Sequence, residues 1–107
     1  MTAEYYEKTK HPDSEIDYGR IWAEFLQHKD GTKATVVTST WVITSKTEAV
    51  PTLTISAKGE GILQSIDATY LWLIGGTDGV KYEIENTMID SLDRTEVKTG
   101  TLLVKVK

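Results

Sequence analysis

The chain has 107 residues, a length that suits a single domain with one modest hydrophobic core. Hydrophobic residues make up 39% of it and charged residues 26%, a balance typical of folded globular proteins rather than of disordered chains. The formal net charge of −4 argues against nucleic acid as a partner, because phosphate binding needs a basic surface. Cysteine is absent from the sequence, which excludes disulfides, thiolate metal sites and a cysteine nucleophile.

The N-terminal residues 1–14 are polar and lack a regular hydrophobic period, which predicts a flexible arm without a secretory signal. Two adjacent aromatic residues, Tyr5 and Tyr6, are the exception. A frayed terminus is the favoured interpretation, and the alternative is that these two side chains dock onto this domain or onto a neighbouring subunit. The longest strongly apolar run, residues 70–74, is far too short to span a bilayer, so the sequence predicts no membrane partner.

The segment from residue 16 to residue 26 changes its hydrophobic period partway. Ile16 and Tyr18 alternate with neighbouring residues, as in a strand. Trp22 and Phe25 then follow a helical stripe that is too short for a stable isolated helix. The sequence therefore predicts a strand through about Trp22 and one helical turn after it. Trp22 and Phe25 are also candidates for contact with a partner protein.

Two alternating segments follow in the middle of the chain. The first, residues 33–44, has a face centred on Trp41, the kind of aromatic residue that forms the centre of a sandwich core. The members of this face are Val37, Ser39, Trp41 and Ile43. In the second segment the apolar positions are Leu53, Ile55 and Ala57. The sequence Lys-Gly-Glu-Gly at residues 58–61 predicts a turn after this second strand.

Residues 62–74 are predicted to form either one long strand or two short strands broken near Asp67. The second half, which contains Trp72 and Leu73, is apolar on both faces and is therefore expected to be central or covered.

A glycine-rich turn at residues 75–79 leads into a strand with clean alternation. Gly75, Gly76 and Gly79 suit a reversal that needs positive φ. The apolar face of the following strand consists of Val80, Tyr82, Ile84 and Met88. In immunoglobulin-like sandwiches a tyrosine at such a corner bonds the backbone a few residues upstream. Tyr82 is expected either to form this tyrosine corner with Leu73 and the glycines or simply to pack in the core.

The C-terminal segment begins with a predicted turn at residues 91–94, in which Asp93 is the residue expected in a left-handed conformation. The last strand covers residues 95–107, and its inward positions are Leu102, Val104 and Val106. Leu103 breaks this alternation, so it is either covered by the N-terminal arm or exposed at an interface.

About seven short strands, with turn signals roughly every ten residues, indicate an all-β fold. We expect an immunoglobulin-like (fibronectin III-like) antiparallel Greek-key β-sandwich that forms a single domain over residues 15–107. A small barrel is the second architecture that this pattern allows.

The polar residues give no sign of a catalytic or metal site. His11 and His28 are the only histidines, and neither has neighbours at the spacing of metal ligands. Asp13, Glu15 and Asp17 would share a strand face, where a solvated acidic edge is favoured over a Ca²⁺ site. No nucleophile, base and oxyanion donor can be combined, so the sequence predicts a protein without enzymatic activity, cofactor or metal.

Several short motifs occur in a fixed order along residues 11–107. They are His11-Pro-Asp13, Asp17-Tyr18-Gly19, Trp22 with Phe25-Leu26, Ser39-Thr-Trp41, Trp72-Leu73 with Gly75-Gly76-Thr77, Tyr82, Asn86-Thr87, and Arg94-Thr95 before a basic terminal strand. As an ordered set they resemble a family of small tailed-phage virion proteins, the fiber-tail or head-tail adaptor proteins. Ile21, Phe25 and Asp93 depart from the pattern, in which an Asp, a second Trp and a turn glycine are usual. Residues 48–61 have no clear match.

The resemblance implies a non-enzymatic structural protein of a phage or prophage virion, an immunoglobulin-like adaptor that joins tail, fiber or head components. The implied partners are tail, fiber, portal or head-completion proteins, together with further copies of the chain. The implied location is the virion, and the host cytoplasm during assembly.

Two groups of residues follow from these expectations. The candidate interface residues are Tyr5, Tyr6, Trp22, Phe25 and Leu103, and the structural residues are Trp41, Trp72, Leu73, Gly75, Gly76, Gly79, Tyr82 and Arg94. The alternative function is a stand-alone carbohydrate- or surface-binding module, in which Trp22, Trp41 and Trp72 form a stacking platform for sugars.

Overall fold

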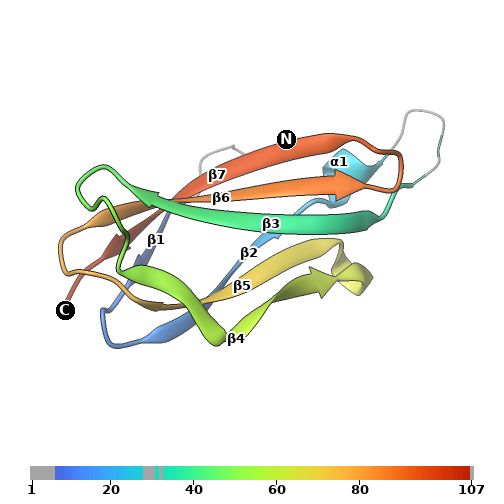
Figure 1. Cartoon of the computed structure of the whole chain (residues 1–107). Coiled ribbons are helices and arrows are strands. Elements are labelled where there is room, and N and C mark those ends of the chain that lie inside the picture. Colours follow the sequence, from blue (N-terminus) through green and yellow to red (C-terminus); the bar gives the residue numbers. More distant parts are fainter. Residues whose placement is uncertain (1–6, 28–30, 32, 107) are drawn as a thin grey trace.

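The computed structural model describes residues 7–27, 31 and 33–106. Its elements are β1 (Glu7–Lys10), β2 (Glu15–Ile21), α1 (Ala23–Leu26), β3 (Val36–Ser45), β4 (Leu53–Leu63), the 3₁₀ turn η1 (Gln64–Ile66), β5 (Ala68–Gly75), β6 (Lys81–Asp90) and β7 (Thr95–Val104). The strands form two open sheets that pack face to face (Figure 1). Sheet A has the order β1-β7-β6-β3, and sheet B has the order β2-β5-β4.

Seven strands in two packed sheets confirm the predicted all-β class and strand number, and the helical turn α1 lies where the sequence predicted it, directly after Trp22. The chain crosses between the sheets after β1, β2, β3 and β5, so neighbours in sequence often lie in different layers. The sheets are not closed into a barrel. The immunoglobulin-like Greek key stays a prediction.

Strand β1 lies within the segment that the sequence analysis treated as an arm. Residues 7–10 pair in parallel with β7, so that Thr9 lies beside Leu103 and Lys10 beside Val104. Sheet A therefore contains one parallel pair, whereas the sequence led us to expect antiparallel pairing throughout. The pairing gives backbone groups of β7 a hydrogen-bonding neighbour, which explains why this polar stretch is ordered.

Strand β3 has a register shift near its start. The pairing with β6 moves from Val36 opposite Asp90 to Thr38 opposite Ile89, so one residue of β3 has no partner on β6. This bulge turns Val36 into the core and leaves Val37 exposed, the reverse of the predicted face. From Ser39 onward the predicted alternation holds, with Trp41 buried.

Strand β4 replaces the turn that was predicted at residues 58–61. The strand runs from Leu53 to Leu63, and its register against β5 shifts between Ile55 and Glu60. The bulged stretch between these residues contains Gly59 at a φ of 79°, whereas Gly61 pairs regularly with Tyr70, and the chain does not reverse. The predicted break near Asp67 is confirmed, since η1 and a left-handed Asp67 separate β4 from β5.

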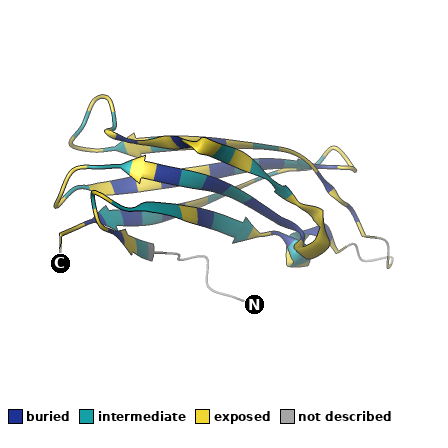
Figure 2. Ribbon diagram, turned by 90° about the horizontal axis from the view of Figure 1, so that it is seen from below, coloured by how far each residue is buried: buried dark blue, intermediate teal, exposed yellow. Residues whose placement is uncertain are grey.

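The core fills the space between the sheets, and buried positions alternate with exposed ones along the strands (Figure 2). One cluster of buried side chains contains Tyr18, Trp41, Leu53, Leu71, Leu73, Tyr82, Ile84, Leu102 and Val104. A second contains Trp22, Leu26, Ala34, Val36 and Met88. Val106, which was predicted to face inward, is half exposed because β7 ends at Val104.

Candidate protein interface

At one end of the sandwich, Glu48 collects hydrogen bonds from three segments of the chain. Its carboxylate accepts from the hydroxyls of Tyr82 at 2.7 Å and Thr77 at 2.6 Å, and from the backbone N–H of Thr52 at 3.0 Å. We call these four residues the Glu48 cluster. The cluster ties the β3–β4 loop to the β5–β6 turn and to the core through Tyr82, which is fully buried.

The donors of the Glu48 cluster favour the ionised carboxylate. They hold the pKa of Glu48 at about 2, with the hydroxyl of Thr77 contributing most and that of Tyr82 next. Glu48 is therefore a fixed negative charge at neutral pH. Its role here is to order two loops.

Tyr82 also makes the backbone contact predicted from the sequence. Its hydroxyl accepts a hydrogen bond of 3.0 Å from the N–H of Thr77, five residues upstream. The turn glycines before it all adopt positive φ: 84° at Gly75, 100° at Gly76 and 85° at Gly79. At Gly76 an added Cβ would also lie 2.6 Å from the side chain of Val104. Both the positive φ and this steric contact therefore exclude a side chain at this position. The assignment of these residues as structural stays a prediction.

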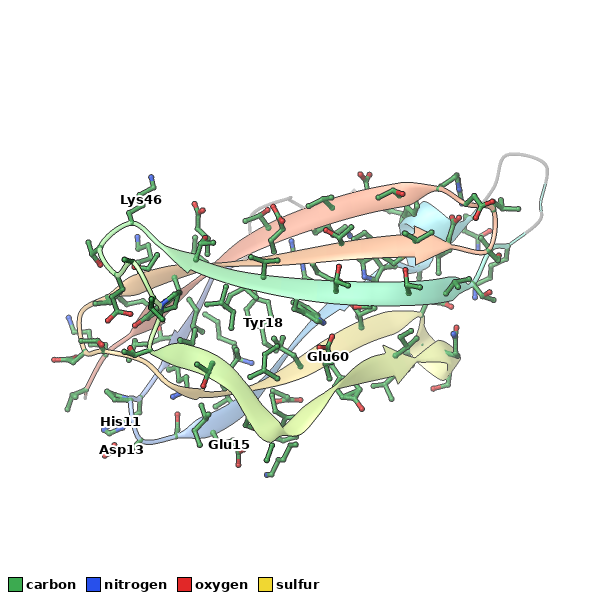
Figure 3. All side chains as sticks on the ribbon, in the orientation of Figure 1. His11, Asp13, Glu15, Tyr18, Lys46 and Glu60 are labelled. Carbon is green, nitrogen blue, oxygen red and sulfur yellow. The ribbon has the colours of Figure 1, made fainter. Side chains whose placement is uncertain are left out.

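The same end of the sandwich is fastened by Lys10. Its side chain is buried, and its ammonium group donates to the carbonyls of Gly75 at 2.7 Å, His11 at 2.8 Å and Pro12 at 3.3 Å. Burial lowers the pKa of Lys10, and the attraction of Asp13 partly offsets that effect. Figure 3 shows His11 and Asp13 below and Lys46 above at this end, so the β1–β2 turn and the β3–β4 loop both contribute to its surface.

The core next to α1 contains a buried polar network that crosses between the sheets. The indole N–H of Trp22 donates to Thr69 at 3.0 Å and to Asn86 at 3.1 Å. The amide of Asn86 in turn donates to the hydroxyl of Ser39 at 2.9 Å and to the carbonyl of Thr40 at 3.0 Å. This network therefore links β3, β5 and β6 to the residue that precedes α1.

Arg94 joins the β6–β7 turn to α1. Its side chain pairs with the buried carboxylate of Asp90 at 2.8 Å and lies 4.7 Å from the centre of the Phe25 ring. Burial raises the pKa of Asp90, but hydrogen bonds from Arg94 and from the N–H of Leu92 outweigh it and leave the pKa below its ordinary value. Asp93, at the tip of this turn, has a φ of 61°, which confirms the predicted left-handed residue.

The structure does not gather the candidate interface residues into one surface. Tyr5 and Tyr6 lie outside the described residues. Trp22 is 0% exposed, so its assignment to an interface is corrected: the indole belongs to the core. Phe25 is half-buried on α1, and Leu103 is half-buried on the outer face of sheet A, between Thr9 and Lys81 on the neighbouring strands.

The three tryptophans do not form a common platform for sugars. Trp22 and Trp41 are buried, in different core clusters. Trp72 is half-buried on the outer face of sheet B, where the ammonium group of Lys58 lies 4.4 Å from the centre of its ring. These positions contradict the stacking surface of three indoles that the carbohydrate-binding alternative requires.

Across residues 7–27, 31 and 33–106, no group of three or more His, Cys, Asp or Glu side chains could hold a metal ion. Glu15, one of the three acidic residues considered for Ca²⁺, pairs instead with Lys58 at 3.3 Å. No helix in the described part of the chain is long and apolar enough to cross a membrane.

Sequence reasoning did not single out Glu48 or Lys10, and it named Asn86 only as part of a motif, without a structural role. Asn86 could have been found, because it shares the inward parity of Tyr82 and Met88 on β6 and a polar residue at such a position needs buried partners. Glu48 and Lys10 carry no such signal, since their partners Tyr82 and Gly75 lie far away in the sequence.

The geometry does not identify a family, so the chain was compared with known proteins. No curated protein matches the chain. The sequence model of the family described as podophage GP4 fiber-tail adaptor protein gp77 matches residues 10–103, which include all the strands from β2 to β6 and most of β7. The chain therefore belongs to the podophage GP4 fiber-tail adaptor family.

Proposed function

We propose that this protein is a non-enzymatic component of a podophage virion that joins the fibers to the tail through protein–protein contacts. The observation that carries the proposal is the family match over residues 10–103. The location that follows is the assembled virion, preceded by the host cytoplasm while particles form. Portal or head-completion proteins are further partners at the same vertex.

The shape of the domain supports a joining role. Its principal extents are 47 × 27 × 24 Å, so the two ends of the sandwich are well separated. Loops at one end are held by the Glu48 cluster, and the turn at the other is held by Asp90 and Arg94. Rigid, preordered loops lower the entropic cost of docking.

Two of the candidate interface residues remain suitable for such contacts. Phe25 belongs to α1, which lies at one end of the sandwich (Figure 1), and Leu103 lies on the outer face of β7, where it pairs with Thr9 of β1. Tyr5 and Tyr6 precede β1 in sequence. We assign Phe25 and Leu103 to contacts with different partners, since they belong to separate parts of the domain.

The proposal is tested by following the chain in particles of the phage that encodes it. We expect gold-labelled protein at the tail of wild-type virions in electron micrographs, and particles without fibers when its gene is deleted. Labelled protein that is absent from purified virions, or a deletion that leaves the fibers in place, would contradict the proposal.

A matched pair of variants tests the surface. Leu103→Lys should reduce binding of purified tail or fiber proteins, whereas Val97→Lys, on the exposed face of the same strand, should not. Thermal unfolding of both variants checks that the fold is retained. Equal binding by the two variants would remove Leu103 from the interface.

A further inference from the structure

Strand β3 differs from the other strands at the edges of the two sheets. In the described part of the chain it is the last strand of sheet A, and β6 is the only strand hydrogen-bonded to it. An edge strand presents about half of its N–H and C=O groups to the outside, which makes it a template for another strand. Proteins usually protect such edges with charges, bulges, proline or a short strand.

The other three edges carry these protective features. β1 has four residues, two of them lysines, and β2 carries Glu15, Asp17 and Arg20. β4 has a bulge and two glycines, with Lys58 and Glu60 beside them.

The ten residues of β3, Val36–Ser45, include no charged residue and no proline. Its single bulge lies at its start, and the side chains of Val37 and Val42 are 53% and 50% exposed. The strand is thus long, regular over Thr38–Ser45 and uncharged. Figure 1 shows β3 along the side of the sandwich, parallel to its long axis.

A second observation lies on the inner side of the same edge. A shallow apolar groove, largely open to solvent, is lined by Trp41, Ile43, Pro51, Leu53, Thr54 and Ile55. Trp41 is 9% exposed, and its indole N–H has no hydrogen-bond acceptor among the residues that the structure describes. A buried donor without an acceptor is costly, so this side of the domain is incomplete in the isolated chain.

We propose that β3 pairs antiparallel with β3 of a second copy of this chain, so that the two A sheets form one continuous sheet. The inference does not depend on the proposed function. Identical uncharged strands oppose no like charges in any register, whereas β1, β2 and β4 set like charges opposite each other in some registers. With a net charge of −4 on each chain, the uncharged edge is the one that a second copy can approach most closely.

The two-fold symmetry of such a pair also suits Trp41. When the two-fold axis is normal to the sheet, side chains that lie opposite each other on the two β3 strands point to the same face of the sheet. In the register centred on Thr40, Ser39 of the second copy lies opposite Trp41 on the inner face. A serine oxygen has two lone pairs, so it can accept from the indole N–H while it accepts from Asn86 of its own chain.

Two charge variants test the proposal. Thr38→Lys, Thr40→Lys and Val42→Lys together place positive charges along the outer side of β3. Thr38→Glu and Thr40→Glu place negative charges there and keep Val42, because Glu85 lies directly opposite it on β6. Like charges in facing strands repel. The dissociation constant of the dimer should therefore be at least about tenfold higher for each variant than for the wild type.

Analytical ultracentrifugation from micromolar to millimolar concentration measures the association. We expect a concentration-dependent dimer for the wild type, weak association for each variant alone, and a restored dimer when the two are mixed. The matched control carries Thr95→Lys, Val97→Lys and Thr99→Lys on exposed positions of β7, and it should dimerise like the wild type.

A wild-type chain that stays monomeric at every concentration overturns the proposal. So does a lysine variant that dimerises as well as the wild type, because the contact would then lie elsewhere. Restoration in the mixture cannot come from misfolded variants. None of these measurements involves phage particles, so their outcome is separate from that of the fiber-tail experiments.

Discussion

Asn86 offers the sharpest test of how the two sheets are held together. Its side chain is fully buried and uses all of its hydrogen-bonding capacity. The amide oxygen accepts from Trp22 and from Thr69, and the amide nitrogen donates to Ser39 and to the carbonyl of Thr40. Asn86→Leu keeps a similar volume and removes every one of these contacts.

The expected loss follows from what the substitution leaves behind. The indole N–H of Trp22 keeps the hydroxyl of Thr69 as an acceptor at 3.0 Å. The hydroxyl proton of Thr69 is left buried without the acceptor that Asn86 supplied, and the carbonyl of Thr40, which is only partly buried, loses one donor. A buried unpaired group costs about 1–3 kcal/mol, and a partly buried one costs less, so we expect Asn86→Leu to lower the free energy of unfolding by about 1–4 kcal/mol, out of a typical total of roughly 5–15 kcal/mol.

Chemical denaturation followed by tryptophan fluorescence measures this loss. Glu85→Leu introduces the same residue at the neighbouring exposed position of β6 and should change stability by less than about 0.5 kcal/mol. Ser39→Ala removes one half-buried partner of Asn86, which water can replace, so its effect should lie between the two. An Asn86→Leu variant as stable as the wild type, or no more affected than Ser39→Ala, would refute the reasoning.

Three further predictions concern the ends of the sandwich. Gly76→Ala should lower the free energy of unfolding by about 2–4 kcal/mol, because the new side chain would be strained at positive φ and would also contact Val104 in the core. Gly79 also has a positive φ but has open space around it. Gly79→Ala should therefore lower the free energy of unfolding by only about 1–2 kcal/mol in the same denaturation assay. The folded-state pKa of Glu48 lies at about 2, below its unfolded value of 4.5, so its contribution to stability is present above pH 4.5 and is lost as the pH falls towards 2. Melting temperatures across this range should therefore fall less steeply for Glu48→Gln than for the wild type, and equal slopes would contradict the assignment. Arg94→Lys should lower the melting temperature, because a single ammonium group cannot keep the bond of Arg94 Nε to Asp90 together with the position of the guanidinium over the Phe25 ring. A melting temperature equal to that of the wild type would show that the turn does not depend on the guanidinium group.

Local patterns were sufficient to predict most of the elements and part of the core. Alternation in residues 81–90 placed Tyr82, Ile84 and Met88 correctly, because one face of β6 is buried along its length. Turn chemistry located the left-handed Asp93 and the corner at Tyr82. These features depend on a few neighbouring residues, which is why one sequence contains enough information to find them.

The failures have a different physical origin. The bulges in β3 and β4 shift the pairing register, and such a shift depends on the opposing strand rather than on the residues within the bulge. The exposure of Trp22 was misjudged because its acceptors, Thr69 and Asn86, lie on distant strands. Residues 7–10 are ordered by pairing with β7, at the other end of the chain. In each case a long-range contact overrides the local preference.

The placement of β3 also bears on how a joining protein can associate with itself and with other partners at once. The sites that fix the loops, the Glu48 cluster and the Asp90–Arg94 pair, lie at opposite ends of the long axis, whereas β3 runs along its side. Pairing through β3 would therefore add a second copy laterally and leave both ends free to bind other components. Pairing at either end would instead cover the loops that the polar contacts hold in place. A lateral dimer and an adaptor with two free ends thus use different surfaces of the same rigid domain.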